Sequence, residues 1–144
     1  MLDYRTETSP YSSIFTLAND SIKTLHLDKT TRNRLNRPID NPKRGRSYPA
    51  TLIGRIGVNQ EFQGMNVGSQ LMQFIKDWFR HEDNKTGCRF LVVDAYNNPR
   101  TLHFYERNDF RFLHTDEVEE RAYYDIPCEE TIATRLMYFD LKKA

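Results

Sequence analysis

The chain has 144 residues, of which 38% are hydrophobic, and its 21 basic and 20 acidic residues give a formal net charge of +1. This length predicts one domain, residues 1–144, and the charge balance excludes a polyanionic or polycationic chain. No apolar run reaches the ~20 residues of a membrane-spanning helix, and the first residues lack a signal-peptide stretch, so we expect a cytoplasmic protein with no membrane partner. Cys88 and Cys128 stand in no Cys/His motif, which predicts free thiols and no metal site.

In the first half of the chain, residues 1–10 predict an irregular start and residues 13–17 a strand, because the latter are β-branched and aromatic. Residues 23–47 are basic, and their prolines prevent a continuous helix. We expect a short helix at 28–35, capped by Asp28, and a long loop after it.

The second half alternates apolar strands with amphipathic helices. It predicts strands at 50–58, 89–95, 110–113 and 133–141, and helices at 68–81 and 99–107. Asn98 and Pro99 are suited to begin the second helix, and an acidic loop is expected between the last two strands. This order predicts an α/β fold with at least one parallel crossover.

A glycine-containing segment joins the strand at 50–58 to the helix that follows. Gly64 and Gly68 allow a tight turn, and Asn66 tolerates a left-handed backbone. Backbone amides at the start of a helix bind phosphate or pyrophosphate. An ordinary strand-to-helix turn remains the alternative, and the spacing matches neither a P-loop nor a dinucleotide fingerprint.

A second motif follows the strand at 89–95. Asn98, Tyr105 and Phe110, together with the segment Gln63-Gly64-Met65-Asn66-Val67-Gly68, resemble the two motifs of the GNAT superfamily of N-acetyltransferases. Asn66 stands in place of the family's middle glycine, and Asn108-Asp109 replaces its glycine-containing turn. The resemblance covers roughly residues 50–113.

The resemblance implies a mixed, mostly antiparallel sheet with helices on both faces and a V-shaped splay between its two central parallel strands. Family members usually have a further strand and one or two helices before the segment at 13–17. We therefore expect a short N-terminal part, which reflects a truncated chain, a misplaced start, or a natural short form that completes its fold as a homodimer.

The resemblance also implies acetyl-CoA as co-substrate and assigns roles to individual residues. Tyr105 is the catalytic residue, protonating the departing thiolate, and no general base stands out. The cofactor-binding residues are Ile56, Gly57, Val58, Gln63, Gly64, Met65, Asn66, Val67, Gly68, Ser69 and Asn98. The backbone at 56–58 should pair with pantetheine, residues 63–69 should hold the pyrophosphate, and Asn98 should contact the pantetheine region.

Residues 52–58 and 92–95, with Phe104-Tyr105, look like the toxin-type branch of the superfamily. Members of that branch acetylate the α-amino group of aminoacyl-tRNA, and their partner is usually a ribbon-helix-helix antitoxin. The basic segment suits RNA phosphates, and its candidate contacts are Arg32, Arg34, Arg44 and Arg46. A solvated loop, balanced by the acidic residues at 116–130, is the alternative.

Three other functions remain open at this stage. The chain could acetylate a small-molecule or protein amine, bind CoA as a truncated non-catalytic module, or bind nucleic acid through the basic loop alone.

Overall fold

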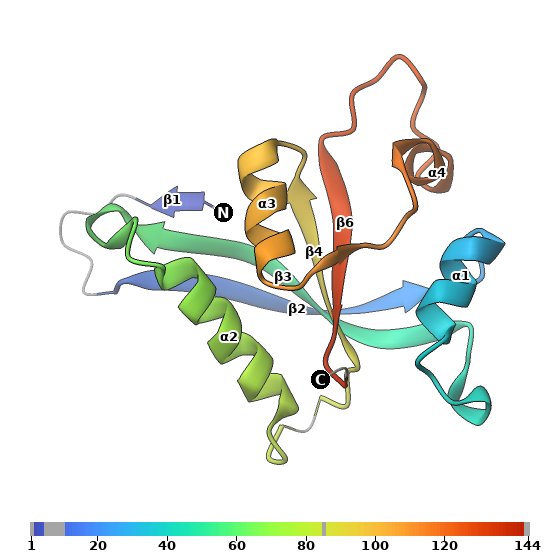
Figure 1. The fold of residues 1–144 in the computed structure, drawn as a ribbon, viewed down its shortest axis with the longest axis horizontal. Coiled ribbons are helices and arrows are strands. Elements are labelled where there is room, and N and C mark those ends of the chain that lie inside the picture. The colour runs from blue at the N-terminus through green and yellow to red at the C-terminus, as the bar shows by residue number, and fades with distance from the viewer. Residues whose placement is uncertain (1, 5–10, 85, 143–144) are drawn as a thin grey trace.

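The computed structural model describes residues 2–4, 11–84 and 86–142. Its strands form one six-stranded sheet in the order β1-β3-β4-β6-β5, with β2 also paired to β3 (Figure 1). The β3–β4 and β1–β3 pairs are parallel and the other pairs are antiparallel. The strands are β1 (Leu2–Tyr4), β2 (Ser13–Lys23), β3 (Ser47–Asn59), β4 (Phe90–Tyr96), β5 (Arg111–Phe112) and β6 (Thr134–Asp140).

Four α-helices and two short 3-10 helices connect the strands. They are α1 (Lys29–Asn36), η1 (Asn41–Lys43), η2 (Gln60–Phe62), α2 (Val67–Arg80), α3 (Pro99–Arg107) and α4 (Glu117–Tyr123). The predicted caps are confirmed, since Asp28 accepts from the Thr31 amide and Asn98 from the Thr101 amide. None of the helices in the described part of the chain is long and apolar enough to cross a membrane.

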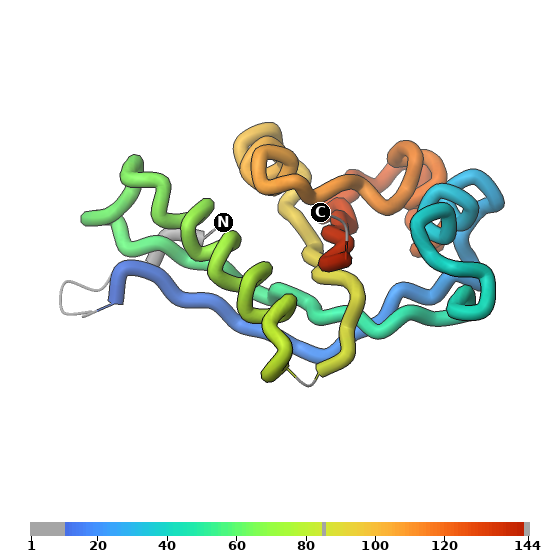
Figure 2. Tube along the Cα trace, turned by 60° about the horizontal axis from the view of Figure 1, so that its bottom comes forward, coloured from blue at the N-terminus to red at the C-terminus, as the bar shows by residue number. Residues whose placement is uncertain are grey.

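Two apolar clusters lie on opposite faces of the sheet. Along β4, Leu91 and Val93 belong to the cluster under α2 and α3, whereas Phe90 and Val92 belong to the cluster that includes Leu35 of α1. This alternation follows from the two-residue period of a strand. Together with the strand directions, the two clusters confirm the prediction of a mostly antiparallel sheet that is covered on both faces. Figure 2 shows α1 and α4 gathered at one end of the molecule, away from α2.

The two central parallel strands separate along their length, which confirms the predicted splay. β3 and β4 pair only from Ala50–Phe90 to Leu52–Val92, although β3 continues to Asn59. The β2–β3 register shifts between Thr16 and Leu17 and leaves Gly54 without a partner. Such a bulge bends its strand, so the sequence of β3 itself contributes to opening the V.

Three elements differ from those predicted. β2 continues to Lys23 instead of ending at residue 17, because its whole length pairs with β3 and this ladder outweighs the turn preference of Asn19 and Asp20. β5 has two residues instead of four. The acidic loop contains α4, whose cap Asp116 accepts from the Glu119 amide and whose first turn is acidic, as the helix dipole favours.

The N-terminal segment takes an unexpected place. Its backbone at Leu2–Tyr4 forms β1, which pairs in parallel with Gly57–Asn59 of β3. Because β2 pairs with the opposite edge of these residues, β1 lies on the edge that faces the splay. The rest of the predicted irregular start, residues 1 and 5–10, lies outside the described residues.

Candidate active site

The loop before α2 has the left-handed turns that its sequence predicts. Gly64 has a φ of 81° and Asn66 a φ of 62°, and Asn66 directly precedes the helix. An asparagine tolerates this backbone because its short polar side chain avoids most of the penalty that other residues incur. The replacement of the family's middle glycine therefore keeps the turn.

Most amides of this loop are left for a ligand. The N–H groups of Gln63 and Met65 donate to the carbonyls of Gln60 and Phe62, and that of Gln70 donates to Asn66. For the amides of residues 64 and 66–69, the described chain provides no acceptor. The side-chain Nε2 of Gln63 is also buried without a partner in the described chain. These donors converge at the positive end of the α2 dipole, where an anion is favoured.

A groove of about 250 Å³ lies in front of these amides. Val58, Phe62 and Phe104 form its apolar part, and Arg100 and Arg107 of α3 reach it from the other side. No ion pair involves these two arginines in the part of the chain that the structure describes. The donor set therefore fits a diphosphate. The two arginines were missed from the sequence because they lie on another element, 30 residues or more along the chain.

A second opening of about 150 Å³, here called the slot, lies between the splayed strands. Its lining residues are Gly54, Arg55, Ile56, Val93, Asp94, Ala95, Tyr96, Thr101, Tyr105 and Thr134. Of the residues predicted to face pantetheine, Ile56 lines the slot and Val58 lines the groove, whereas Asn98 borders neither. The Asn98 side chain caps α3 in this structure.

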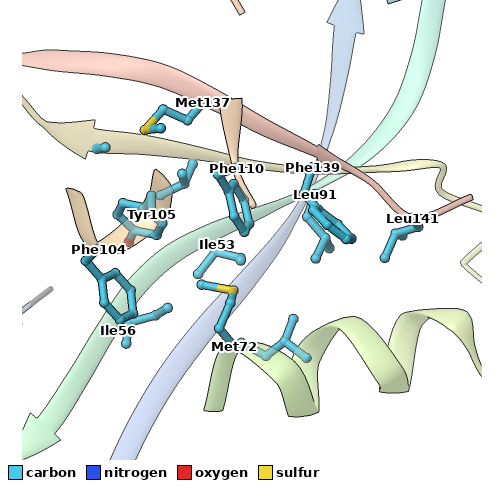
Figure 3. Packing of buried hydrophobic residues seen from close by; sticks show 13 residues of the cluster. Ile53, Ile56, Met72, Leu91, Phe104, Tyr105, Phe110, Met137, Phe139 and Leu141 are labelled. Carbon is cyan, nitrogen blue, oxygen red and sulfur yellow. The ribbon is translucent and has the colours of Figure 1, made fainter. Parts of the chain in front are cut away.

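Tyr105 reaches the slot from α3. Its ring packs edge-on against Phe104 and Phe110, with centroid distances of 5.1 and 5.6 Å (Figure 3). Only 4% of the residue is exposed, and this burial raises the pKa of the phenol to about 12. No described group forms a hydrogen bond with its hydroxyl. A neutral phenol at the edge of the slot can therefore donate a proton to a group placed there.

The edge of β3 that should pair with pantetheine is partly taken. β1 pairs with Gly57, Val58 and Asn59 on the side that faces the splay. An extended ligand arm can pair with these backbone groups only after it displaces β1. Groove and slot are nevertheless neighbours along the end of β3, because Val58 lines the groove and Ile56 the slot.

The arginines predicted to bind RNA lie on α1 and in the loop that follows it. Arg34 donates to the carbonyls of Leu113 and Phe112, and Arg44 donates from Nε to the carbonyls of Ile39 and Asn36 at 2.9 and 3.2 Å. These two side chains therefore brace the chain. Arg46 is exposed and Arg32 is partly buried.

Arg34 also lines a cavity of about 610 Å³ between α1, α2 and β6. The sequence did not reveal this basic cavity, because Arg37, Lys76, Arg80 and Arg111 come to it from three separate elements. Two carboxylates reach it, and Asp140 is already paired with Arg89 at 2.9 Å. Lys76 is buried against the Asn108 carbonyl, and its burial lowers its pKa. The cavity therefore carries a net positive charge suited to an anion.

The thiols and the acidic residues form no metal site among the described residues. Cys88 is partly buried and Cys128 is exposed, and both are free. Among the described residues, no three His, Cys, Asp or Glu side chains are placed to hold a metal ion.

The sheet is mixed and splayed, and a buried tyrosine lies between the splay and an anion site at the start of a helix. This combination is typical of transferases that use an acyl-CoA. A family model for the acetyltransferase (GNAT) family matches residues 35–110, more than half of the chain. The chain therefore belongs to the GNAT acetyltransferase family. No curated protein matches it by sequence.

Solved structures show the same fold at low sequence identity. AtaT complexed with acetyl-methionyl-tRNAfMet has a TM-score of 0.62 and 16% identity, covering 94% of this chain and 67% of that one. A KacT mutant has a TM-score of 0.54 and 18% identity, covering 90% and 62%. The KacTA–DNA complex has a TM-score of 0.50 and 18% identity, covering 90% and 58%. The chain thus spans 58–67% of the length of these three structures.

Proposed function

We propose that this chain is an acetyl-CoA-dependent N-acetyltransferase whose acceptor is the α-amino group of aminoacyl-tRNA. The observation that carries the first part is the convergence of free amides at residues 64 and 66–69 with Arg100 and Arg107 on one groove. Acetyl-CoA, when bound, supplies the acetyl group as an activated thioester.

Different residues of the chain bind different parts of acetyl-CoA. The loop amides, the Gln63 side chain and the two α3 arginines hold the diphosphate. Once β1 is displaced, the edge of β3 at Ile56–Val58 aligns the arm, and the apolar residues around Tyr105 shield the side of the slot that faces α3. Tyr105 keeps its proton across the neutral range and donates it to the sulfur as the thiolate leaves.

The basic cavity supports an RNA acceptor. Phe90 lines this cavity and Tyr96 lines the slot, and these residues stand at the two ends of β4. Val93 also lines the slot, so at about 3.3 Å per residue the slot begins roughly 10 Å from Phe90 and extends to roughly 20 Å from it. If the cavity holds RNA phosphates, the acceptor end of the RNA has to span this distance to reach the thioester. The fold neighbour AtaT was solved with acetyl-methionyl-tRNAfMet.

The acceptor is tested by incubating the protein with acetyl-CoA and following free thiol in the presence of aminoacyl-tRNA, uncharged tRNA or spermidine. We expect thiol release with aminoacyl-tRNA alone. Release with spermidine and none with charged tRNA would instead identify a small-amine acetyltransferase.

The RNA site is tested with two sets of variants. Arg37 and Arg111 line the cavity and form no side-chain hydrogen bond or ion pair within the described chain, whereas Arg32 and Arg46 lie outside the cavity. We expect Arg37→Ala with Arg111→Ala to weaken tRNA binding and flatten its salt dependence by about one unit of slope per arginine. A larger loss from Arg32→Ala with Arg46→Ala would place the RNA on the loop instead.

An aminoacyl-tRNA acceptor places the protein in the cytoplasm and calls for control of its activity. By the same proposal its partner is a ribbon-helix-helix antitoxin, in keeping with the fold neighbour solved as the KacTA–DNA complex. A homodimer is the assembly we propose for the active form. Co-expression with the antitoxin gene should abolish the acetylation that the chain alone performs.

A further inference from the structure

Tyr105 accounts for the proton that the departing sulfur needs, but the attacking amine must lose a proton as well. Asp94 of β4 lines the same slot as Tyr105. Its neighbours Val93 and Ala95 belong to the cluster beneath α2 and α3, so strand alternation turns the Asp94 side chain to the other face of the sheet. The slot is thus bordered by a phenol from one face and a carboxylate from the other.

Asp94 is an exposed residue at the mouth of the slot, although the neighbouring chain removes part of the solvent from its carboxyl group. Burial raises the pKa of Asp94, and the nearby carboxylates of Asp20 and Glu120 raise it further. Glu120 is itself paired with Arg135, whose Nε lies 2.5 Å from its carboxylate. The charged or titratable groups around Asp94 are Asp20 of β2, Arg55 of β3, Tyr105 of α3, Glu120, Tyr123 and Tyr124 of α4 and its cap, and Arg135 of β6.

These features suit a group that attracts an amine and takes its proton. With Glu120 paired to Arg135, the carboxylates of Asp20 and Asp94 still outnumber the remaining cation, Arg55, so this mouth of the slot is weakly acidic and favours an ammonium ion. A carboxylate with a raised pKa is also a better proton acceptor near neutral pH than an ordinary one. Tyr124 lies close enough that Asp94 contributes to raising the pKa of its phenol.

We propose that Asp94 is the catalytic proton acceptor for the attacking amine. The inference rests on the acetyl transfer proposed above and not on the identity of the acceptor. The neutral amine attacks the thioester carbonyl, a C–N bond forms and the C–S bond breaks. The proton that leaves nitrogen goes to the Asp94 carboxylate, and the proton of the Tyr105 hydroxyl goes to sulfur. The proton on Asp94 then returns to the phenolate, so that amine and thioester become amide and thiol.

The α-amino group of an aminoacyl ester suits this arrangement. Amines of this kind have a reference pKa of about 8, so a substantial fraction is neutral near neutral pH. A lysine side chain, with a reference pKa of about 10.4, would arrive almost wholly protonated. The slot therefore favours amines of low basicity, of which one fraction is protonated and another is neutral near neutral pH.

The test compares Asp94→Asn with Asp94→Glu and with Asp20→Asn, which changes the same acidic mouth without lining the slot. The measurements are kcat/KM from pH 5 to 9 with the acceptor that the wild type uses, and the Kd of acetyl-CoA. We expect Asp94→Asn to lower kcat/KM by about 10²–10⁴-fold and to abolish the acidic limb of the profile, while the Kd changes less than about twofold.

The other two variants separate catalysis from local charge. Asp94→Glu should retain the acidic limb and part of the activity. Asp20→Asn should lower kcat/KM much less than Asp94→Asn does, while it keeps the acidic limb and moves it to lower pH, because a like charge beside Asp94 is removed. An unchanged acidic limb in Asp94→Asn would overturn the proposal. If the wild type transfers acetyl to none of the amines tested, the proposed function fails instead.

Discussion

The proton of Tyr105 is retained by the side chains around it. Phe104 and Phe110 leave the phenolate form without solvent, so the pKa of about 12 is an effect of desolvation alone. A free thiol has a reference pKa of about 8.5, so complete transfer from this phenol requires a thiolate whose own pKa is raised by the same buried surroundings. The side chain is thus a proton donor with no tendency to ionise beforehand.

Replacing Tyr105 with Phe removes that donor and keeps the ring. We expect kcat to fall by about 10²–10⁴-fold, with the Kd of acetyl-CoA unchanged, as measured by thiol release and calorimetry. The wild-type profile should show no basic limb from this group below about pH 10. A weaker acetyl-CoA affinity with an unchanged kcat would instead make Tyr105 a residue of the cofactor wall.

Asn66 has a backbone conformation that few residues adopt. At a φ of 62° it begins the helix whose amides face the groove. Asn66→Gly should preserve the loop and acetyl-CoA affinity. Asn66→Val should lower the free energy of unfolding by about 1–2 kcal/mol and weaken the binding of acetyl-CoA, and calorimetry measures both effects. Equal affinities in the two variants would show that the turn does not present the amides.

At the scale of elements, α4 is held by one buried carboxylate. Glu120 is 1% exposed, lies 2.5 Å from Arg135 and accepts from the Leu136 amide at 2.7 Å. Glu120→Ala leaves Arg135 buried without this partner, so we expect about 3–5 kcal/mol lower stability in urea denaturation. Glu117→Ala is the control, because Glu117 is half exposed at 3.6 Å from the same arginine and should cost under about 1 kcal/mol. Similar losses in both variants would contradict the assignment.

β1 is the element that we expect to compete with acetyl-CoA for the edge of β3. Its backbone pairs with Gly57–Asn59 on the splayed edge. A chain that begins at Tyr11 should bind acetyl-CoA about three- to tenfold more tightly, the equivalent of one net hydrogen bond, when both forms are titrated calorimetrically. Thermal melts of the two chains report whether the fold is kept. An equal or weaker affinity in the shortened, folded chain would show that β1 does not compete.

The elements show which parts of the fold the sequence could predict. The α2 and α3 helices and the apolar strand β4 follow from local periodicity and caps, and their predicted bounds were right to within a residue or two. The far half of β2 was missed because Asn19 and Asp20 favour a turn locally, and only the ladder with β3 overrules them. The helix α4 was missed because its first turn is acidic and its one buried anchor is a charged residue.

The site followed the same division. Loop and tyrosine positions are local motifs, so they could be predicted from the residues that carry the family resemblance. Arg100 and Arg107 line the groove and Asp94 lines the slot where separate elements meet, and no spacing along the chain signals that meeting.

At the scale of the whole molecule, a formal net charge of +1 hides two opposite regions. Basic side chains from three elements line the cavity between α1, α2 and β6, while Asp20, Asp94 and Glu120 gather at the slot. A ligand that is anionic along its length and cationic at its end matches this separation. An aminoacyl-tRNA has both properties, since phosphates run to an end that carries an amine.

The central claim is that the amides after Gly64 bind the diphosphate of acetyl-CoA, and calorimetric titration tests it most directly. Acetyl-CoA and S-acetylpantetheine share the thioester and the arm, but only the former has the diphosphate. Charge-assisted hydrogen bonds of about 1.5–3 kcal/mol each predict that acetyl-CoA binds at least about tenfold more tightly. Equal affinities, or no binding of acetyl-CoA to the folded protein, would contradict the account.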